Sequence, residues 1–356
     1  MRHIYFISFA LAFLVSFVGT FLVARIAVRK KILDVPDNER RLHKHPVPTM
    51  GGIAVFVSFF LVTLTIGVLL GYLLNGNLPL KILISIWAGG AILMIGGYLD
   101  DKYRLSPRYS VIFPIIAALV MVSSGISAVS IHNPFSGEII LLDQIKAFGL
   151  PLASSLVVFA WILVMIFTTK VLDGMDGLTT GVSAIASLVL FGLSLTPQVM
   201  QAQTALLAII FAGALLGFLI LNFYPAKIFL GEGGSTLAGF VLAVLAIVSG
   251  GKIATAVLVL GIPLMDAFWV LLQRLFSRQN IFKGDRKHLH FRLLDIGFSE
   301  PQAVLFLYVL SGIFGVTALF LQSLGKLVLL AILAGIMVVI VGAVFIFYKV
   351  RQKSNE

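Results

Sequence analysis

The chain has 356 residues, of which 60% are hydrophobic and 12% charged, and its mean hydropathy is +1.08. Soluble proteins carry about 25% charged residues, so this composition excludes an ordinary soluble domain. The formal net charge of +11 would suit a nucleic-acid partner, but its distribution along the chain argues against one, and the absence of cysteine excludes disulfides and thiolate chemistry.

Long apolar blocks make up most of the sequence, and most of them can cross roughly 30 Å of hydrocarbon at about 1.5 Å per residue. Because a backbone in lipid must satisfy its own hydrogen bonds, these blocks are expected to be helices. The sequence therefore predicts an all-α polytopic membrane protein with about eleven transmembrane helices in a single domain, residues 1–356. The block 235–249 is short enough to be a tilted or partly re-entrant span. The blocks cover residues 4–28, 50–74, 80–98, 109–129, 152–169, 178–196, 202–223, 235–249, 252–272, 302–322 and 326–349.

Basic residues are distributed unequally between the loops. When the loops are assigned alternately to the two sides of the membrane, 21 of the 26 Lys and Arg residues fall on one side. The positive-inside rule places that side in the cytoplasm, with the N-terminus outside and the C-terminus inside. Cations near anionic lipid head groups explain the basic charge, so we expect a lipid bilayer and no nucleic acid as a partner. On the outer side, alternating residues around 133–137 predict a short β-hairpin.

Acidic residues follow the same asymmetry, although the orientation rule does not require it. Twelve of the 15 Asp and Glu residues fall on the cytoplasmic side, and only Glu138 and Asp143 fall outside. Carboxylates gathered beside cations at a membrane surface indicate a metal and an anionic substrate. Asp266 lies within a block, where an acid marks a functional site by default or else hydrogen-bonds between helices.

Asp100 and Asp101 close the third block. A helix C-terminus is the wrong end for negative charge, so a pair of merely solvated acids there carries an energetic cost. Adjacent side chains on a helix point about 100° apart. One carboxylate can therefore bind a metal while the other faces a different group.

The segment Asp173-Gly174-Met175-Asp176-Gly177 follows the fifth block. Its glycines allow a tight turn, and Asp176 is placed to cap the helix that begins near Leu178. Capping explains one aspartate but not both. Lys170 lies on the same helical face as Asp173, where it can meet a phosphate or pair with that acid.

The segment Gly231-Glu232-Gly233-Gly234-Ser235 leads directly into the eighth block. Glycines let backbone amides approach a ligand closely. Ser235 is a candidate N-cap, and the positive end of its helix would favour a phosphate. Glu232 is then either a ligand of a hard metal ion or a solvated turn residue.

The largest cytoplasmic loop, 273–301, is the predicted catalytic loop, because it combines cations with His288 and His290. A His-x-His pair is half of a zinc site, but no cysteine or second histidine pair accompanies it. A phosphate or pyrophosphate clamp fits the flanking Arg286, Lys287 and Arg292 better. The alternative is a basic segment lying among lipid head groups.

Taken in order, these residues resemble the polyprenyl-phosphate N-acetylhexosamine-1-phosphate transferases. This glycosyltransferase 4 type of membrane enzyme includes the phospho-N-acetylmuramoyl-pentapeptide transferase of peptidoglycan synthesis. The resemblance spans nearly the whole chain, from Asp34-Val35-Pro36 and the segment 43–52 to the His288-Leu289-His290 loop. It rests on the order, spacing and common side of the motifs, since each motif alone is only moderately specific.

The resemblance implies transfer of a sugar-1-phosphate from a UDP-sugar to undecaprenyl phosphate, with release of UMP and with Mg²⁺, or Mn²⁺ in its place, as cofactor. It makes Asp101 and Glu232 the expected metal ligands, and Asp100 the group that orients or deprotonates the acceptor phosphate. Asp173 and Asp176 then border the nucleotide site, with His288 and His290 near the pyrophosphate. The expected substrate-binding residues are Lys170, Gly231, Gly233, Gly234, Ser235, Arg286, Lys287, Arg292 and His45.

Three departures from the family pattern involve four positions. Lys170 and Phe167 stand where the family commonly has asparagines, Glu232 replaces the usual aspartate, and Phe291 replaces a further histidine. All three departures preserve the charge that the chemistry requires. A lipid phosphate is already an anionic nucleophile, so the main difficulty is to bring two anions together, which Mg²⁺ and cations achieve.

The expected location is the bacterial cytoplasmic (inner) membrane, with the active site on the cytoplasmic face. N-acetylglucosamine is the expected sugar, because the His288 loop looks closer to the teichoic-acid and enterobacterial-type initiators than to the muramoyl-pentapeptide enzymes; another UDP-N-acetylhexosamine is the alternative. A homodimer is compatible with the family. A transporter for an anionic substrate is the competing class, but it would place polar residues near the bilayer midplane in repeated halves. A CDP-alcohol phosphatidyltransferase is disfavoured, because its longer aspartate pattern is missing around Asp173.

Overall fold

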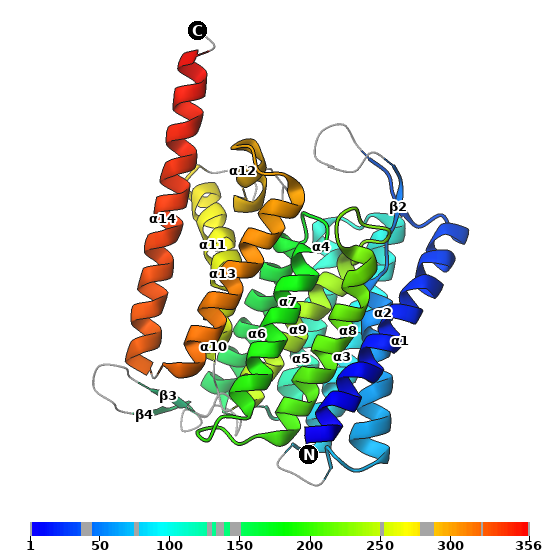
Figure 1. Ribbon diagram of the computed structural model, residues 1–356. Helices are drawn as coiled ribbons and strands as arrows, with labels where there is room; N and C mark the ends of the chain where they lie inside the picture. Colours follow the sequence, from blue (N-terminus) through cyan, green and yellow to red (C-terminus); the bar gives the residue numbers. More distant parts are fainter. Residues whose placement is uncertain are drawn as a thin grey trace.

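Figure 1 shows the computed structural model, which is almost entirely helical. It describes residues 2–36, 45–74, 78–126, 130–132, 139–142, 151–249, 253–277, 288–321 and 323–354. The helices are α1 (Arg2–Arg29), α2 (Gly52–Val62), the π-helix η1 (Thr63–Leu69), α3 (Leu80–Tyr103), α4 (Pro107–Ser110), α5 (Ile112–Ser123), α6 (Leu152–Leu172), α7 (Leu178–Ser194), α8 (Ala202–Asn222), α9 (Gly231–Val248), α10 (Ile253–Val259), α11 (Gly261–Phe276), α12 (Leu289–Asp295), α13 (Glu300–Phe320) and α14 (Ser323–Ser354).

All eleven predicted apolar blocks fall on helices, and the all-α membrane class is confirmed. Within the described ranges, seven helices are long and apolar enough to cross a membrane, or eight if α10 and α11 form one broken span. The blocks 109–129, 178–196 and 326–349 correspond to shorter apolar helices. The number of eleven crossings therefore stays a prediction.

The sharp bend in the bundle lies in block 252–272, whereas the sequence had pointed to block 235–249 as a tilted or partly re-entrant span. Helix α9 begins four residues before the apolar block 235–249 and is 18 residues long, which is enough for a straight span. The next block is the broken one, since α10 and α11 meet at an angle of 81°. Pro263 lies in the first turn of α11, where its missing N–H is tolerated.

Two antiparallel strand pairs complete the secondary structure of the described segments. Strands β3 (Ser130–His132) and β4 (Ile139–Leu141) form the predicted hairpin. Strands β1 (Leu33–Asp34) and β2 (Val47–Pro48) form a second pair that the sequence did not suggest. The hairpin β3–β4 and the N-terminus lie at one end of the bundle, whereas β2, α4, α12 and the C-terminus lie at the other (Figure 1).

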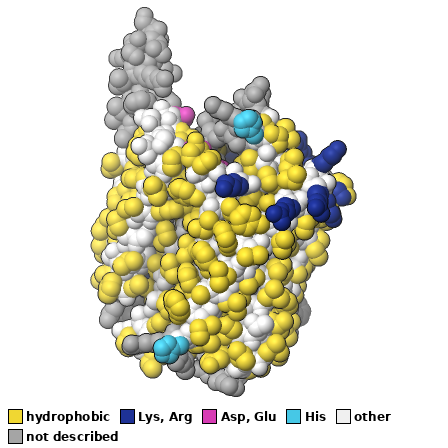
Figure 2. All heavy atoms as spheres, turned by 45° about the vertical axis from the view of Figure 1, so that its right-hand side comes forward, with side chains coloured by type: hydrophobic (Ala, Val, Ile, Leu, Met, Phe, Trp, Pro, Cys, Tyr) yellow, Lys and Arg dark blue, Asp and Glu magenta, His cyan; other side chains and the backbone are white. Residues whose placement is uncertain are grey.

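The bundle is apolar both inside and on its flank. Helices α8 and α9 are mostly buried at its centre, whereas α1 presents Phe6 (74% exposed) and Leu14 (56% exposed) outward. On the face in Figure 2, hydrophobic side chains cover most of the surface, and Lys and Arg gather near its upper end. An apolar flank with charge at its end is the surface that a bilayer requires.

Glycines allow the backbones of three helices to touch near that charged end. A Cβ atom on Gly97 of α3 would lie 2.2 Å from Cα of Gly233 in α9. A Cβ atom on Gly52 of α2 would lie 2.2 Å from Cα of Gly234. Only glycine fits at these crossings. They bring the C-terminal end of α3 against the N-terminal end of α9, where the acidic motifs lie.

Candidate active site

A cavity of about 460 Å³ opens where the ends of α3, α6 and α9 meet. All five carboxylates predicted for the site line it, although they come from distant parts of the chain. Lys170 is the one cationic side chain among the described residues of this lining. The acidic residues of the lining are Asp34, Asp100, Asp101, Asp173, Asp176, Glu232 and Glu300.

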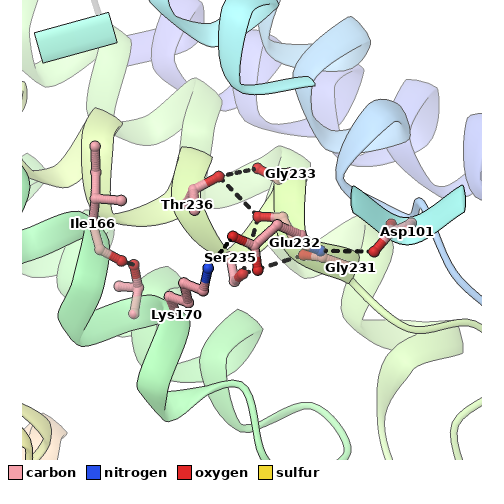
Figure 3. Close-up of polar contacts among 9 residues, drawn as sticks. Asp101, Ile166, Lys170, Gly231, Glu232, Gly233, Ser235 and Thr236 are labelled. Carbon is pink, nitrogen blue, oxygen red and sulfur yellow. Dashed lines mark hydrogen bonds and ion pairs between the residues drawn. The ribbon is translucent and has the colours of Figure 1, made fainter. Parts of the chain in front are cut away.

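The N-terminus of α9 explains why an aspartate is stable at the C-terminus of α3. The backbone N–H of Glu232 donates a hydrogen bond to Oδ1 of Asp101 at 3.3 Å (Figure 3). Gly231 has a φ of +77°, and a Cβ atom there would lie 2.5 Å from Oδ2 of Asp101. Asp101 therefore sits at the positive end of α9, which offsets the unfavourable end of its own helix.

Glu232 forms an ion pair with Lys170. Oε1 of Glu232 contacts Nζ of Lys170, which reaches it from the last turn of α6 (Figure 3). The sequence had suggested a phosphate or Asp173 as the partner of Lys170, so the observed partner is new. Two departures from the family pattern, at positions 170 and 232, thus contact each other.

The turn between α6 and α7 is held from two sides. Oδ2 of Asp176 accepts the backbone N–H of Ala226 at 2.8 Å. The backbone N–H of Asp176 donates to Oε1 of Glu300 at 3.0 Å. The N-cap of α7 is Gly177, with a φ of +76°, and the hydroxyl of Tyr308 donates to its carbonyl oxygen at 2.6 Å. Asp176 is therefore fixed in the turn without occupying the predicted cap position.

Asp173 lies in the same turn, with its side chain open to the cavity. Desolvation by the surrounding protein raises the pKa of Asp173 above its usual value, and the carboxylates of Glu232 and Asp101 raise it further. A hydrogen bond from Thr179 lowers that pKa. Water in the cavity moderates the desolvation. The site is thus crowded with negative charge and favours a cation.

Ser235 lies inside α9, four residues after its first residue Gly231, so the prediction that it caps this helix is wrong. The N-cap position is Leu230, and the Ser235 hydroxyl donates to the carbonyl oxygens of Gly231 and Glu232 at 3.2 Å each. Ser235 and Gly231 still line the cavity. Gly233 and Gly234 instead form the helix crossings, outside that lining.

The two histidines lie beside the cavity and outside its lining, which contains Phe291 from the same helix. Nδ1 of His288 lies 2.8 Å from Oδ2 of Asp266. His290 is 2% exposed, and its Nε2 would be 2.4 Å from a Cβ atom on Gly174. Burial lowers the pKa of His290 to about 4, so this ring is neutral and packs under the Asp173 turn.

The remaining predicted substrate-binding residues are not brought to the cavity by the described part of the chain. Arg292 lies on α12 and His45 lies before β2, both outside the lining. Arg286 and Lys287 fall outside the described residues. Substrate-binding roles for these four residues stay predictions.

Sequence reasoning missed four polar residues of the lining: Asp34, Thr49, Asn222 and Glu300. Asp34 begins a motif of the resemblance, which was a usable signal. Asn222 accepts from the Thr180 hydroxyl at 2.7 Å and donates to the Ile228 carbonyl at 3.0 Å. A single asparagine at the end of an apolar block does not by itself indicate a functional site. An acid such as Glu300 at a helix N-terminus is also ordinary.

The donor set suits a hard cation such as Mg²⁺. Among the described residues, no group of three or more His, Asp or Glu side chains is preassembled as a metal cage. Mg²⁺ does not need one, because it commonly keeps several waters and uses one or two carboxylates together with substrate phosphates. Asp101 and Glu232 both line the cavity; the backbone N–H of Glu232 binds Asp101, while the Glu232 carboxylate contacts Lys170 and would have to leave it to bind a metal.

Comparison with known proteins supports the same grouping of motifs. The model of glycosyl transferase family 4 matches residues 83–250, the stretch that carries the acids of α3, of the Asp173 turn and of α9. The undecaprenyl-phosphate alpha-N-acetylglucosaminyl 1-phosphate transferase of Salmonella typhi is 30% identical over 325 residues, which are 86% of this chain and 82% of that protein. The chain belongs to glycosyl transferase family 4.

Two further relatives extend this family likeness over most of the chain. The probable undecaprenyl-phosphate N-acetylglucosaminyl 1-phosphate transferase of Bacillus subtilis (strain 168) is 29% identical, with 89% of this chain and 85% of that protein covered. The decaprenyl-phosphate N-acetylglucosaminephosphotransferase of Mycobacterium tuberculosis (strain ATCC 25618 / H37Rv) is also 29% identical, with coverages of 85% and 78%. The family resemblance predicted from the motifs is confirmed.

Proposed function

We propose that this protein transfers N-acetylglucosamine-1-phosphate from UDP-N-acetylglucosamine to undecaprenyl phosphate, with release of UMP. The observation that carries the proposal is the gathering of acids from α3, the Asp173 turn and α9 around one cavity at the charged end of an apolar bundle. The activities named for the relatives supply the substrate class.

The reaction is a phosphoryl transfer between two anions. An oxygen of the acceptor phosphate attacks the phosphorus bonded to the sugar oxygen, and the bond from that phosphorus to the bridging oxygen of UMP breaks. UMP leaves with the bond electrons. Asp101 and Glu232 would hold Mg²⁺, which supplies charge neutralisation for the donor pyrophosphate. The nucleophile is already ionised, so little proton transfer is required.

The chain's own side chains divide the remaining work. Asp100, at the same helix end as Asp101, orients the acceptor phosphate or removes its last proton. Lys170 brings a cation to the rim of an otherwise acidic cavity. Asp173 and Asp176 border the nucleotide, and the hydrogen bonds from Ala226 and to Glu300 hold their turn in place. In this division, the ends of α3 and α9 bind the metal, and the Asp173 turn binds the nucleotide.

The geometry favours an enzyme over a transporter. A transporter would gather polar groups near the bilayer midplane, whereas this cavity lies at one end of the bundle. The proposal includes a bacterial inner membrane, a cytoplasmic cavity and about eleven crossings. The product would begin a cell-envelope glycan such as teichoic acid or lipopolysaccharide. Another UDP-N-acetylhexosamine, Mn²⁺ in place of Mg²⁺ and a homodimer are further elements of the proposal to be tested.

The test uses the purified full chain in detergent or nanodiscs. Undecaprenyl phosphate, Mg²⁺ and a panel of UDP-sugars are supplied, and UMP release is measured. We expect release with UDP-N-acetylglucosamine, dependent on both the lipid and Mg²⁺. Release with a different UDP-sugar would correct the donor, and no release with any of them would overturn the proposal and favour a transporter.

A further inference from the structure

One buried carboxylate outside the cavity lining binds the histidine motif with both oxygens. Asp266 lies in the second turn of α11 and is 9% exposed. Its Oδ2 is 2.8 Å from Nδ1 of His288, and its Oδ1 accepts the backbone N–H of Leu289 at 2.8 Å. The interhelical role weighed for Asp266 from sequence is therefore observed, and its partner is a candidate catalytic residue.

The contact lies at the start of helix α12. His288 is the N-cap of α12 and has no side-chain capping bond of its own, while Leu289 supplies the first helical N–H. Oδ1 of Asp266 satisfies that N–H from a helix more than twenty residues earlier in the chain. A local capping residue could satisfy it equally well. The long reach from α11 is explained if the side chain of His288 is also to be held.

The opposite side of α12 rests on the active-site turn. The rings of His288 and His290 are parallel, with centroids 5.8 Å apart. His290 in turn packs on Gly174, where a Cβ atom would clash with its Nε2. Asp266 on one side and Gly174 on the other thus fix α12 between the bent helix pair and the Asp173 turn.

We propose that Asp266 is the positioning residue of the transferase, which holds His288 in one tautomer and orientation beside the donor pyrophosphate. A carboxylate can only accept, so the proton of a neutral His288 ring must reside on Nδ1. Nε2 is then the ring nitrogen that is left to accept a hydrogen bond. The inference rests on the proposed transfer reaction and adds a residue that acts through His288.

The variant Asp266→Asn changes the hydrogen bond to the His288 ring while it keeps the contact that holds the start of α12. The asparagine oxygen can still accept from Leu289, so the start of α12 is preserved. Its NH₂ group can only donate toward His288, which forces the ring proton from Nδ1 to Nε2. We expect kcat to fall about 10²-fold or more, as expected for a wrong tautomer. The KM for the UDP-sugar and the thermal midpoint should stay close to those of the parent protein.

A matched control perturbs a neighbouring helix start without touching Asp266. Ser299 caps α13 in a capping box with Gln302. Ser299→Ala should lower the thermal midpoint by a few degrees, while kcat falls far less than in Asp266→Asn. If general loosening of this region caused the loss in Asp266→Asn, Ser299→Ala would lower kcat by a similar factor.

A double-mutant cycle and a spectroscopic readout complete the test. Asp266→Asn added to His288→Ala should cause no further loss of kcat, because the positioned ring is already gone. In ¹⁵N-histidine spectra, His288 should carry its proton on Nδ1 in the parent protein and on Nε2 in Asp266→Asn. Parent-like kcat and spectra in Asp266→Asn, or additive losses in the cycle, would overturn the inference. Absence of UMP release from the parent protein would instead overturn the proposed function, while the spectra would still decide whether Asp266 sets the tautomer.

Discussion

Glu232 is the residue on which the proposed metal site depends most. It lies at the N-terminus of α9, where its backbone N–H binds Asp101 and its carboxylate pairs with Lys170. Its side chain thus adjoins both an acidic wall and the one lysine of the described lining. A carboxylate in that position can exchange a lysine partner for a cation bound to substrate.

Glu232→Ala is expected to lower kcat/KM for UMP release at least about 10²-fold, because a proposed Mg²⁺ ligand is removed. The measurement is a Mg²⁺ titration of turnover. Asp295→Asn, at the end of α12 and outside the cavity lining, is the matched acid removal and should leave turnover unchanged. Full Mg²⁺-dependent turnover in Glu232→Ala would exclude Glu232 as a ligand.

Lys170 and Glu232 are expected to behave as one unit. Lys170→Asn leaves Glu232 without its cation in a cavity that six other carboxylates line, and we expect about a tenfold loss in kcat/KM. Glu232→Asp shortens the reach to Lys170 and should also lose activity. The double variant Lys170→Asn/Glu232→Asp should lose less than the two single losses combined, by about 0.5–3 kcal/mol of coupling. The measurement is kcat/KM for all four proteins, and strict additivity would show that the ion pair carries no energetic coupling.

His290 gives the protein a predicted sensitivity to mild acid. The folded pKa of about 4 lies below the unfolded value of about 6.5, so the folded state binds fewer protons between these two pH values. Stability should therefore fall by up to about 3 kcal/mol as the pH drops from 6.5 toward 4. His290→Gln should show a shallower decline in thermal midpoint over this window in the same detergent. Equal slopes for both proteins would contradict the prediction.

At the scale of elements, the crossing of α3 and α9 is the contact on which the site geometry depends. A Cβ atom on Gly97 would press on the backbone of Gly233, which cannot rotate away. Gly97→Ala should lower stability by about 1–3 kcal/mol and reduce kcat by separating Asp101 from Glu232. Thermal unfolding and UMP release are the measurements. Gly312→Ala in α13 is the control, because nothing lies within 4 Å of its added Cβ atom. Equal behaviour of the two variants would show that the crossing is not tightly packed.

Apolar block length was sufficient to predict where the helices lie, since hydrocarbon requires helices of that length. The apolar pattern did not predict the first residues of α9, because Gly231, Gly233 and Gly234 are poor helix formers and are typical of a loop. Tertiary contact with Gly52 and Gly97 overrides that preference. The bend between α10 and α11 was also missed, although Gly261 and Pro263 are ordinary breaking signals.

At the scale of the whole molecule, the charge distribution predicted that twelve acids share one side of the membrane, and the motifs singled out five of them, all of which line the cavity. It could not predict the partner of Lys170 or of Asp266. Those partners depend on contacts between residues 62 and 22 positions apart, which no local pattern encodes. Asp34 and Glu300 joined the site for the same reason.

Membrane orientation can be tested directly, because the chain has no cysteine. Ser106 lies at the cavity end of the bundle, and Gln198 lies in the loop between α7 and α8 at the opposite end. In intact cells, a membrane-impermeant maleimide should label Gln198→Cys and should label Ser106→Cys only after the membrane is disrupted. The reverse pattern would place the cavity outside the cytoplasm and remove access to a cytoplasmic UDP-sugar.

Backbone contact between α3 and α9 also bears on how such an enzyme can diversify. No side chain separates Gly97 from Gly233 or Gly52 from Gly234, so the distance between the backbones that carry Asp101 and Glu232 does not depend on the rotamer of an intervening side chain. Substitutions among the other residues that line the cavity can change which sugar or lipid binds, while the reacting phosphates still contact the same charged groups. New substrate ranges should therefore arise through wall residues such as Phe291, with the chemistry inherited unchanged.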